Sequence, residues 1–344
     1  MTIEPECVLR PLSIGTVQIP TNLVLSPMSG VTDSAFRRTV QAASGAAAGL
    51  LVSEFIAVEG LTRSNAKTIA MLHFEPSERP LSIQIFGADP VRMADAAAMV
   101  EQAGADIVDV NCGCPAPKVV RRGGGAQLMR TPELLRDILR AIRGAISIPF
   151  TVKIRSGWDA ASRNALDVAR MVEDEGAAMI AVHGRTRMQL YSGQSDWDLV
   201  AEVRSRASVP VIGSGDIVDP HTALSKLRDG YADGLMIGRG AIANPWIFAQ
   251  IEAVARGGVP VVPDAEQRVA LVSFFRRCLD ENKQERAYLG RLRGLGCCLV
   301  KGYPGGAAAR RSLGAARSAD EVETVLRQFL LEGRRFDEPL AQVA

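Results

Sequence analysis

The sequence is poor in aromatic residues, in histidine and in net charge. Aromatic side chains make up 5% of the 344 residues, three residues are histidine, and lysine plus arginine exceed aspartate plus glutamate by two. Because the net charge is so small, it does not indicate nucleic-acid binding. A surface that binds nucleic acid would have to come from a local cluster of basic residues.

The six cysteines have the spacing of neither a metal site nor a disulfide framework. Cys112 and Cys114 are one residue apart and Cys297 and Cys298 are adjacent, whereas zinc-binding pairs usually have at least two residues between them. No apolar run reaches the roughly 18 residues of a membrane span. Residues 1–10 contain acids and a proline and lack a signal-peptide core. We therefore expect a cytoplasmic protein with reduced thiols, no metal and no membrane partner.

Short apolar or β-branched runs recur along most of the chain and alternate with stretches of helical periodicity. Eight runs are predicted to be strands: 23–26, 50–53, 81–86, 107–110, 150–154, 179–182, 209–212 and 234–237. Eight strand–helix units over about 250 residues are typical of a (β/α)8 TIM barrel. The alternative is a doubly wound sheet, whose first strand normally precedes a Gly-x-Gly-x-x-Gly turn. Pro27-Met28-Ser29-Gly30 stands at that position instead.

The pattern changes after residue 251, where glycine and proline gather and a largely helical pattern follows from 265 to 331. We therefore predict an α/β chain with a TIM barrel over residues 1–255 and a smaller all-α domain over residues 263–344.

Residues 109–115 read Asp-Val-Asn-Cys-Gly-Cys-Pro and place Cys114 on a loop at the carboxyl end of a predicted strand. A lone cysteine is more often a small buried hydrophobe, but a thiol on such a loop is well placed for chemistry. Chemistry in a TIM barrel takes place at the carboxyl ends of the strands. Polar residues lie at that end of nearly every predicted strand: Glu54, Gln84, Asn111, Lys153, Arg155, His183, Arg185, Ser214, Asp216 and Arg239.

Two features of these strand ends predict an anionic, phosphorylated cofactor. Lys153 lies inside an apolar strand, where an unpaired charge is costly, so a negatively charged partner such as a reduced flavin is expected. The loops after the last two strands are rich in glycine and include Arg239. Such loops commonly form a phosphate site in this fold.

Taken in order, these residues resemble the tRNA-dihydrouridine synthase family, over most of the chain. The similar blocks are 26–33 (the family's flavin loop), 109–115 with 118–119 (its catalytic-cysteine signature), 183–187 (its sixth-strand block), 212–217 and 236–240 (its phosphate loops) and 301–305 (a motif of its helical tail). Ser214 stands where many members have asparagine, and Cys112 where a larger apolar residue is usual.

The resemblance implies a monomeric FMN enzyme with NADPH as electron donor, which reduces the C5=C6 bond of a uridine in the tRNA D-loop to 5,6-dihydrouridine. Hydride would pass from reduced FMN to C6 and a proton from Cys114 to C5, which requires a protonated thiol. The residues that the resemblance implies for cofactor binding are Pro27, Met28, Ser29, Gln84, Asn111, Lys153, His183, Ser214, Gly215, Asp216, Gly238 and Arg239. Asn111 would contact either the flavin or the target base.

The segment from 286 to 319 has seven basic residues and no acid, which predicts a phosphate-binding surface. Arginines on the barrel rim would extend it. The predicted RNA contacts are Arg121, Arg122, Arg185, Arg187, Arg291, Arg293, Lys301, Arg310 and Arg311.

Two alternatives remain open. A flavin barrel that reduces a small pyrimidine or another enone would leave the basic segment without a role. An RNA-binding protein without catalysis would leave Cys114, Lys153 and the phosphate loops unexplained.

Overall fold

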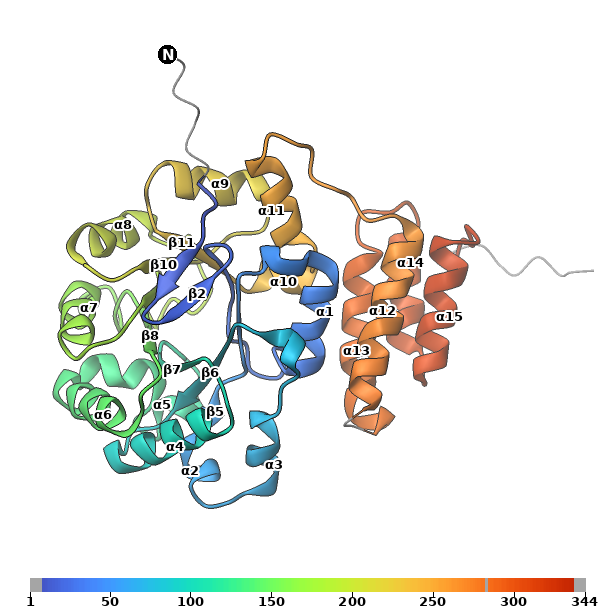
Figure 1. Ribbon diagram of the computed structural model, residues 1–344. Helices are drawn as coiled ribbons and strands as arrows, with labels where there is room; N and C mark the ends of the chain where they lie inside the picture. Colours follow the sequence, from blue (N-terminus) through green and yellow to red (C-terminus); the bar gives the residue numbers. More distant parts are fainter. Residues whose placement is uncertain (1–7, 282–283, 337–344) are drawn as a thin grey trace, which may run out of the picture.

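The computed structural model describes residues 8–281 and 284–336, and its centre is a closed barrel of eight parallel strands (Figure 1). The strands run in the order β4-β3-β11-β10-β9-β8-β7-β6, and pairing of β4 with β6 closes the ring. Their bounds are β3 Leu23–Leu25, β4 Leu50–Val52, β6 Leu81–Phe86, β7 Ile107–Cys112, β8 Phe150–Arg155, β9 Ile180–His183, β10 Val211–Ser214 and β11 Gly234–Ile237. A two-residue strand, β5 (Ile56–Ala57), is added to β6. The predicted TIM barrel is confirmed.

Every predicted strand is present, and the differences lie at the strand ends. β7 is two residues longer than predicted, because Asn111 and Cys112 continue the register with β8 opposite Lys153 and Ile154. β10 begins two residues later than predicted, after Pro210, which has no N–H for the ladder.

Helices surround the barrel, and four of them begin at an aspartate whose side chain accepts a backbone N–H of the first turn. The longer helices are α1 Ser34–Ser44, α4 Pro90–Gln102, α6 Pro132–Ala145, α7 Ala165–Asp174, α8 Trp197–Arg206, α9 Pro220–Arg228 and α11 Ile247–Ala255. The short ones are α2 Val58–Leu61, α3 Ala66–Ile69, α5 Pro117–Val120, α10 Arg239–Ala243 and the 3-10 turns η1 Gly45–Ala47, η2 Ala70–Leu72, η3 Pro76–Glu78 and η4 Gly125–Arg130. Within the described ranges, no helix combines the length and apolar character needed to cross a bilayer.

A hairpin that the sequence analysis missed closes the amino-terminal end of the barrel. Strands β1 (Leu12–Ile14) and β2 (Val17–Ile19) pair across a turn at Gly15 and lie over the barrel opening (Figure 1). Ile14 and Ile19 are fully buried in one cluster with side chains of the barrel interior. Strands of three residues are too short for a clear alternating pattern, which is why they were missed.

The described residues after α11 form four helices that pack beside α1 and α10 (Figure 1). They are α12 Ala265–Asp280, α13 Glu285–Leu299, α14 Gly306–Ala315 and α15 Ala319–Leu330. Arg291 of α13 pairs with Asp33 at the start of α1, and Arg38 of α1 pairs with Glu281. The helical C-terminal part is thus as predicted. The predicted division into domains of residues 1–255 and 263–344 stays a prediction. Residues 1–7, which include Cys7, and residues 337–344 lie outside the described residues.

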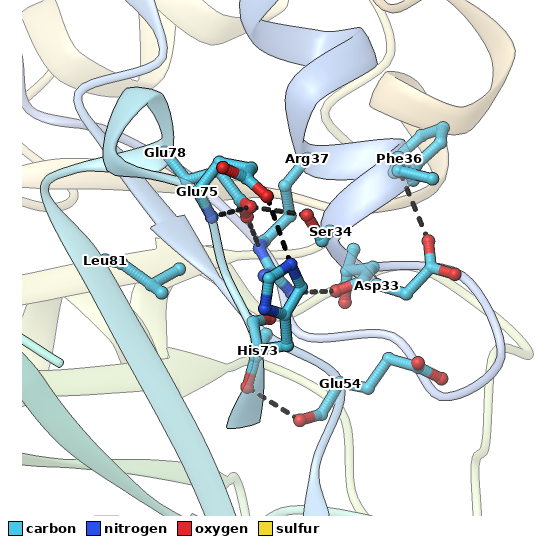
Figure 2. Close-up of polar contacts among 12 residues, drawn as sticks. Asp33, Ser34, Phe36, Arg37, Glu54, His73, Glu75, Glu78 and Leu81 are labelled. Atoms are coloured by element: carbon cyan, nitrogen blue, oxygen red, sulfur yellow. Dashed lines mark hydrogen bonds and ion pairs between the residues drawn. The ribbon is translucent and has the colours of Figure 1, made fainter. Parts of the chain in front are cut away.

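A buried ion pair fixes the start of α1 and the loop before it. Arg37 Nε lies 2.5 Å from Glu78 Oε2, and their side chains are 2% and 0% exposed. Figure 2 shows Arg37 and Glu78 pointing at each other beside Ser34, whose hydroxyl also bonds to Glu78. Arg37 donates as well to the carbonyl of Thr32 at 2.8 Å. Removing one partner of such a pair typically costs about 3–5 kcal/mol, so the segment before α1 is held firmly.

Candidate active site

A cavity of about 580 Å³ opens at the carboxyl ends of the strands. Pockets for small-molecule cofactors usually measure roughly 300–1,000 Å³. All but one of the residues predicted for the cofactor line the cavity: Pro27, Met28, Ser29, Asn111, Lys153, His183, Ser214, Gly215, Asp216, Gly238 and Arg239. Cys114 lines it too, so the barrel brings the predicted acid and the predicted cofactor residues together.

Gln84 is the exception, because it lies inside the barrel and not in the cavity lining. Its amide Nε2 donates to Asp109 Oδ2 at 2.5 Å, and its Oε1 accepts from Asn111 Nδ2 at 2.7 Å. Asn111 Oδ1 in turn accepts the N–H groups of Gly113 and Cys114 at 3.2 and 2.8 Å. Gln84 therefore supports the cysteine turn from below, and its predicted cofactor contact stays a prediction.

The buried carboxylate of Asp109 is the far end of this chain of hydrogen bonds. The Thr151 hydroxyl and the Gln84 amide both donate to it at 2.5 Å. Burial raises the pKa of Asp109, and these two bonds act in the opposite direction. Each carboxyl oxygen accepts one of these bonds, so the side chain of Asp109 orients the Gln84 amide and through it Asn111. The sequence analysis gave Asp109 no role.

The Cys114 thiol is half-buried at the cavity wall. Burial raises its pKa above the ordinary value, while the backbone N–H of Ala116 and the charges of Arg155 and Lys153 oppose that shift. The thiol is therefore protonated near neutral pH, which is the state that a proton donor needs. Cys112 lies fully buried outside the cavity lining, and burial raises the pKa of its thiol strongly.

Lys153 brings a positive charge to the cavity. Burial, followed by the repulsion of Arg155, lowers the pKa of Lys153 to about 8. No described residue forms a hydrogen bond or ion pair with its ammonium, so an anionic ligand would be its natural partner.

His183 is a neutral imidazole in this setting. Burial, together with the surrounding cations, holds the pKa of His183 far below its ordinary value. Arg185 Nη1 lies 3.4 Å from His183 Nε2. Because a guanidinium can only donate, Nε2 accepts and Nδ1 carries the proton.

The loops after β10 and β11 bring backbone close to the cavity. A side chain on Gly215 would meet Ser195 Oγ at 2.3 Å, and one on Gly240 would meet the Ile217 carbonyl oxygen at 2.4 Å. Only glycine fits either position. The Asp216 carboxylate pairs with Arg185 at 2.7 Å and with Arg239 at 3.1 Å, so it orients cations at this end of the cavity.

Arg155 links two loops at the cavity rim. Its Nε donates to the carbonyl of Gly113 at 2.8 Å, and its Nη1 donates to Thr186 and Leu190 at 2.9 and 3.0 Å. Burial lowers the pKa of Arg155 to about 10, so it stays charged. Arg155 and Tyr191 both line the cavity, and neither was assigned a role from the sequence. A charged residue at a strand end was the available signal for Arg155.

The residues predicted to contact RNA fall into two groups. Arg121, Arg122, Lys301 and Arg311 are exposed. Others are engaged within the protein, since Arg185 is 2% exposed and pairs with Asp216, and Arg291 pairs with Asp33. Arg187 lies over the ring of Trp158, and Arg293 donates to the Ala316 carbonyl, so both belong to the engaged group. Arg310 is half-buried. All nine contacts stay predictions.

Metal ligands do not gather anywhere in the described part of the chain. No group of three or more histidine, cysteine, aspartate or glutamate side chains there could hold a metal ion.

Comparison with known proteins gives one family. The family described as dihydrouridine synthase (Dus) matches residues 24–333. The tRNA-dihydrouridine synthase B of Pseudomonas putida is 42% identical over 246 residues, which are 71% of this chain and 72% of that protein. The tRNA-dihydrouridine synthase B of Salmonella typhimurium is 39% identical over 281 residues, which are 80% of this chain and 86% of that protein.

Among solved structures, a variant of NCR from Zymomonas mobilis shares the fold. Its TM-score is 0.53 at 17% identity, and the match covers 76% of this chain and 94% of that one. At this identity the likeness supports the barrel fold alone.

The chain of hydrogen bonds to the cysteine turn leads to a prediction. Asp109→Leu removes the acceptor of the Gln84 amide, so the Gln84 and Asn111 amides lose their orientation. The N–H groups of Gly113 and Cys114 should then exchange with deuterium about tenfold faster, as expected for loss of one hydrogen bond. The control is Thr151→Val, which removes the hydroxyl bond to Asp109 and leaves the bond between Asp109 and Gln84 in place. Equal exchange in both variants and the wild type would contradict the role of this chain.

Proposed function

This chain belongs to the dihydrouridine synthase family, and we propose that it reduces uridine in tRNA to 5,6-dihydrouridine, with FMN as bound cofactor and NADPH as electron donor. The observation that carries the proposal is one cavity lined by both a protonated thiol, Cys114, and an unpartnered ammonium, Lys153. Reduction of a C=C bond needs a proton donor and an electron source. Cys114 suits the role of proton donor, and Lys153 suits the binding of an anionic cofactor that supplies the electrons.

The basic residues that line the cavity and its volume of about 580 Å³ support FMN as the cofactor. When bound and reduced by NADPH, FMN would supply the hydride. Lys153 would face the ring edge that is anionic in reduced FMN, and the Nδ1–H of His183 would offer a hydrogen bond. Arg239 and the close backbone at Gly215 would hold the phosphate, and Pro27 and Met28 would pack against the ring.

Cys114 would protonate C5 of the uracil ring while hydride reaches C6. Burial keeps the proton on its Sγ until the ring is bound, and the bonds from Gly113 and Cys114 to Asn111 hold the turn in place. Arg155 ties this turn to the loop after β9. The protein's own contribution is thus orientation of the ring and delivery of one proton.

Replacing the thiol tests the reaction. Cys114→Ala should retain flavin and tRNA binding and lower dihydrouridine formation by about 10²–10⁴-fold, the usual contribution of a positioned acid. The measurement is the two-hydrogen mass gain of nuclease fragments from unmodified tRNA incubated with FMN and NADPH.

Cys112→Ala is the matched control, because that thiol is buried and lies outside the cavity lining. It should make wild-type amounts of product. Full activity of Cys114→Ala would reject the assigned acid. Steady NADPH oxidation by the wild type with no mass gain in tRNA would favour a small pyrimidine or enone as the substrate.

The pKa of Lys153, about 8, predicts a pH dependence of flavin binding. An anion raises the pKa of the Lys153 it contacts, so affinity is greatest below the pKa of the free protein and falls as pH rises through it. Between about pH 7 and about pH 9.5, the Kd for reduced FMN should rise about tenfold, as measured by calorimetric titration without oxygen. Lys153→Met should bind weakly at all these pH values with a flat profile, and Lys67→Met, an exposed lysine on α3, should keep the wild-type profile. A wild-type profile in Lys153→Met would exclude this partner for the flavin.

We assign tRNA as the macromolecular substrate, with the exposed basic residues near the helical part as phosphate contacts. Arg291 lies against the loop that lines the cavity, so α13 is next to the cavity mouth. Lys301 and Arg311 are exposed and suit phosphate, whereas Arg291 already pairs with Asp33.

Reversal of two exposed charges tests this surface. Lys301→Glu with Arg311→Glu should weaken tRNA binding at least about tenfold and reduce the salt slope by about two. Flavin reduction by NADPH should be unchanged. The control reverses Arg140 and Arg206, which are each 63% exposed on barrel helices. Equal losses of tRNA affinity in both double variants would mean that only total charge matters. No loss of affinity in either variant would mean that tRNA binds to another surface.

A further inference from the structure

Large apolar side chains are exposed on the loop after β9, at the mouth of the cavity. Met188, Leu190 and Tyr191 are 56%, 47% and 57% exposed. Tyr191 lines the active-site cavity, and Met188 lines a second hollow of about 720 Å³ together with Trp158. Residues 188–191 therefore form a ridge between two hollows, and we call them the 188–191 ridge.

The ridge is held in place from below by two buried guanidinium groups. Arg155 donates to the carbonyls of Thr186 and Leu190, and Arg185 donates to those of Ser192 and Gly193. The N–H of Met188 also bonds to the Trp158 carbonyl at 2.9 Å.

The backbone of Leu190 adds a second sign of a built feature. It has φ +52°, a left-handed conformation that leucine adopts only at a cost. The ridge is thus an anchored, strained segment that holds apolar side chains in solvent, and not a loose loop.

Cations lie on both sides of the ridge. The guanidinium carbon of Arg187 lies 4.8 Å from the ring centre of Trp158, and that of Arg130 lies 4.7 Å from it. On the cavity side, the guanidinium carbon of Arg239 lies 4.7 Å from the ring centre of Tyr191. An apolar tip between arginines that stack on aromatic rings fits a nucleic-acid strand, with bases at the tip and phosphates at the sides.

We propose that the 188–191 ridge is a wedge that enters the base stack of the RNA. Met188 and Leu190 fill the gap left by the uridine that turns into the cavity, and Tyr191 lies at the lip where that uridine enters. Extrusion of a base removes its stacking contacts, and an inserted apolar side chain replaces part of them. The occupant is the pair of nucleotides that flank the target, and this inference rests on the proposed reduction of tRNA.

The test removes the apolar tip and keeps the backbone. Met188→Gln with Leu190→Asn forms the wedge variant, because asparagine tolerates the left-handed conformation of residue 190. The matched control is Val259→Asn with Val262→Asn, two aliphatic residues that are 83% and 73% exposed on the connection between α11 and α12. Mass mapping of the wild-type product first locates the reduced uridine. A tRNA with 2-aminopurine beside that uridine then reports unstacking on binding.

Wild type and control should raise the 2-aminopurine fluorescence on binding and reduce the uridine at the same rate. The wedge variant should bind tRNA within about threefold of wild type, lose most of the fluorescence rise and reduce the uridine at least about tenfold more slowly. Placing an abasic residue beside the target should narrow the difference in rate to about threefold, because less stacking is then lost.

A wedge variant that matches wild type in fluorescence and rate would overturn the proposal, and so would one that no longer binds tRNA, since the ridge would then be a plain contact. The wedge and the proposed reaction fail separately. If wild type makes no dihydrouridine in any tRNA, the proposed function fails, and the wedge inference falls with it. If wild type makes dihydrouridine and the wedge variant equals it, only the wedge inference fails.

Discussion

Two guanidinium groups buried at the carboxyl end of the barrel, Arg155 and Arg185, hold the loops of the candidate active site in position. Between them they bond to backbone carbonyls of the cysteine turn and of the loop after β9. Buried carbonyls need donors, and a guanidinium offers several in one rigid plane. Because these loops have little secondary structure of their own, the shape of the cavity mouth depends on these two side chains.

Three basic side chains make the cavity electropositive. Arg155, Lys153 and Arg239 line it, and the carboxylate of Asp216 offsets only part of their charge. The burial of Lys153 and His183, followed by repulsion from neighbouring cations, lowers the pKa values of both residues. Such a site favours an anion, and it keeps the thiol protonated mainly through burial and not through charge.

The helical part is tied to the barrel at the loop that lines the cavity. Asp33 caps α1 and also pairs with Arg291 of α13, while the buried pair of Arg37 and Glu78 fixes the same region from the barrel side (Figure 2). Helix α13 therefore lies directly beside the loop that lines the cavity.

The sequence by itself determined the barrel, the helical tail and the location of the cavity residues, because periodicity, turn residues and strand ends are local properties of a chain. It did not reveal the hairpin β1–β2, whose strands are too short for a pattern. Only the tertiary structure decided that Gln84 supports the cysteine turn from inside the barrel and that Arg291 pairs with Asp33, 258 residues away in the chain. The sequence does not show whether a charged or polar side chain is free or paired, because folding and not the neighbouring residues in the sequence sets its partner.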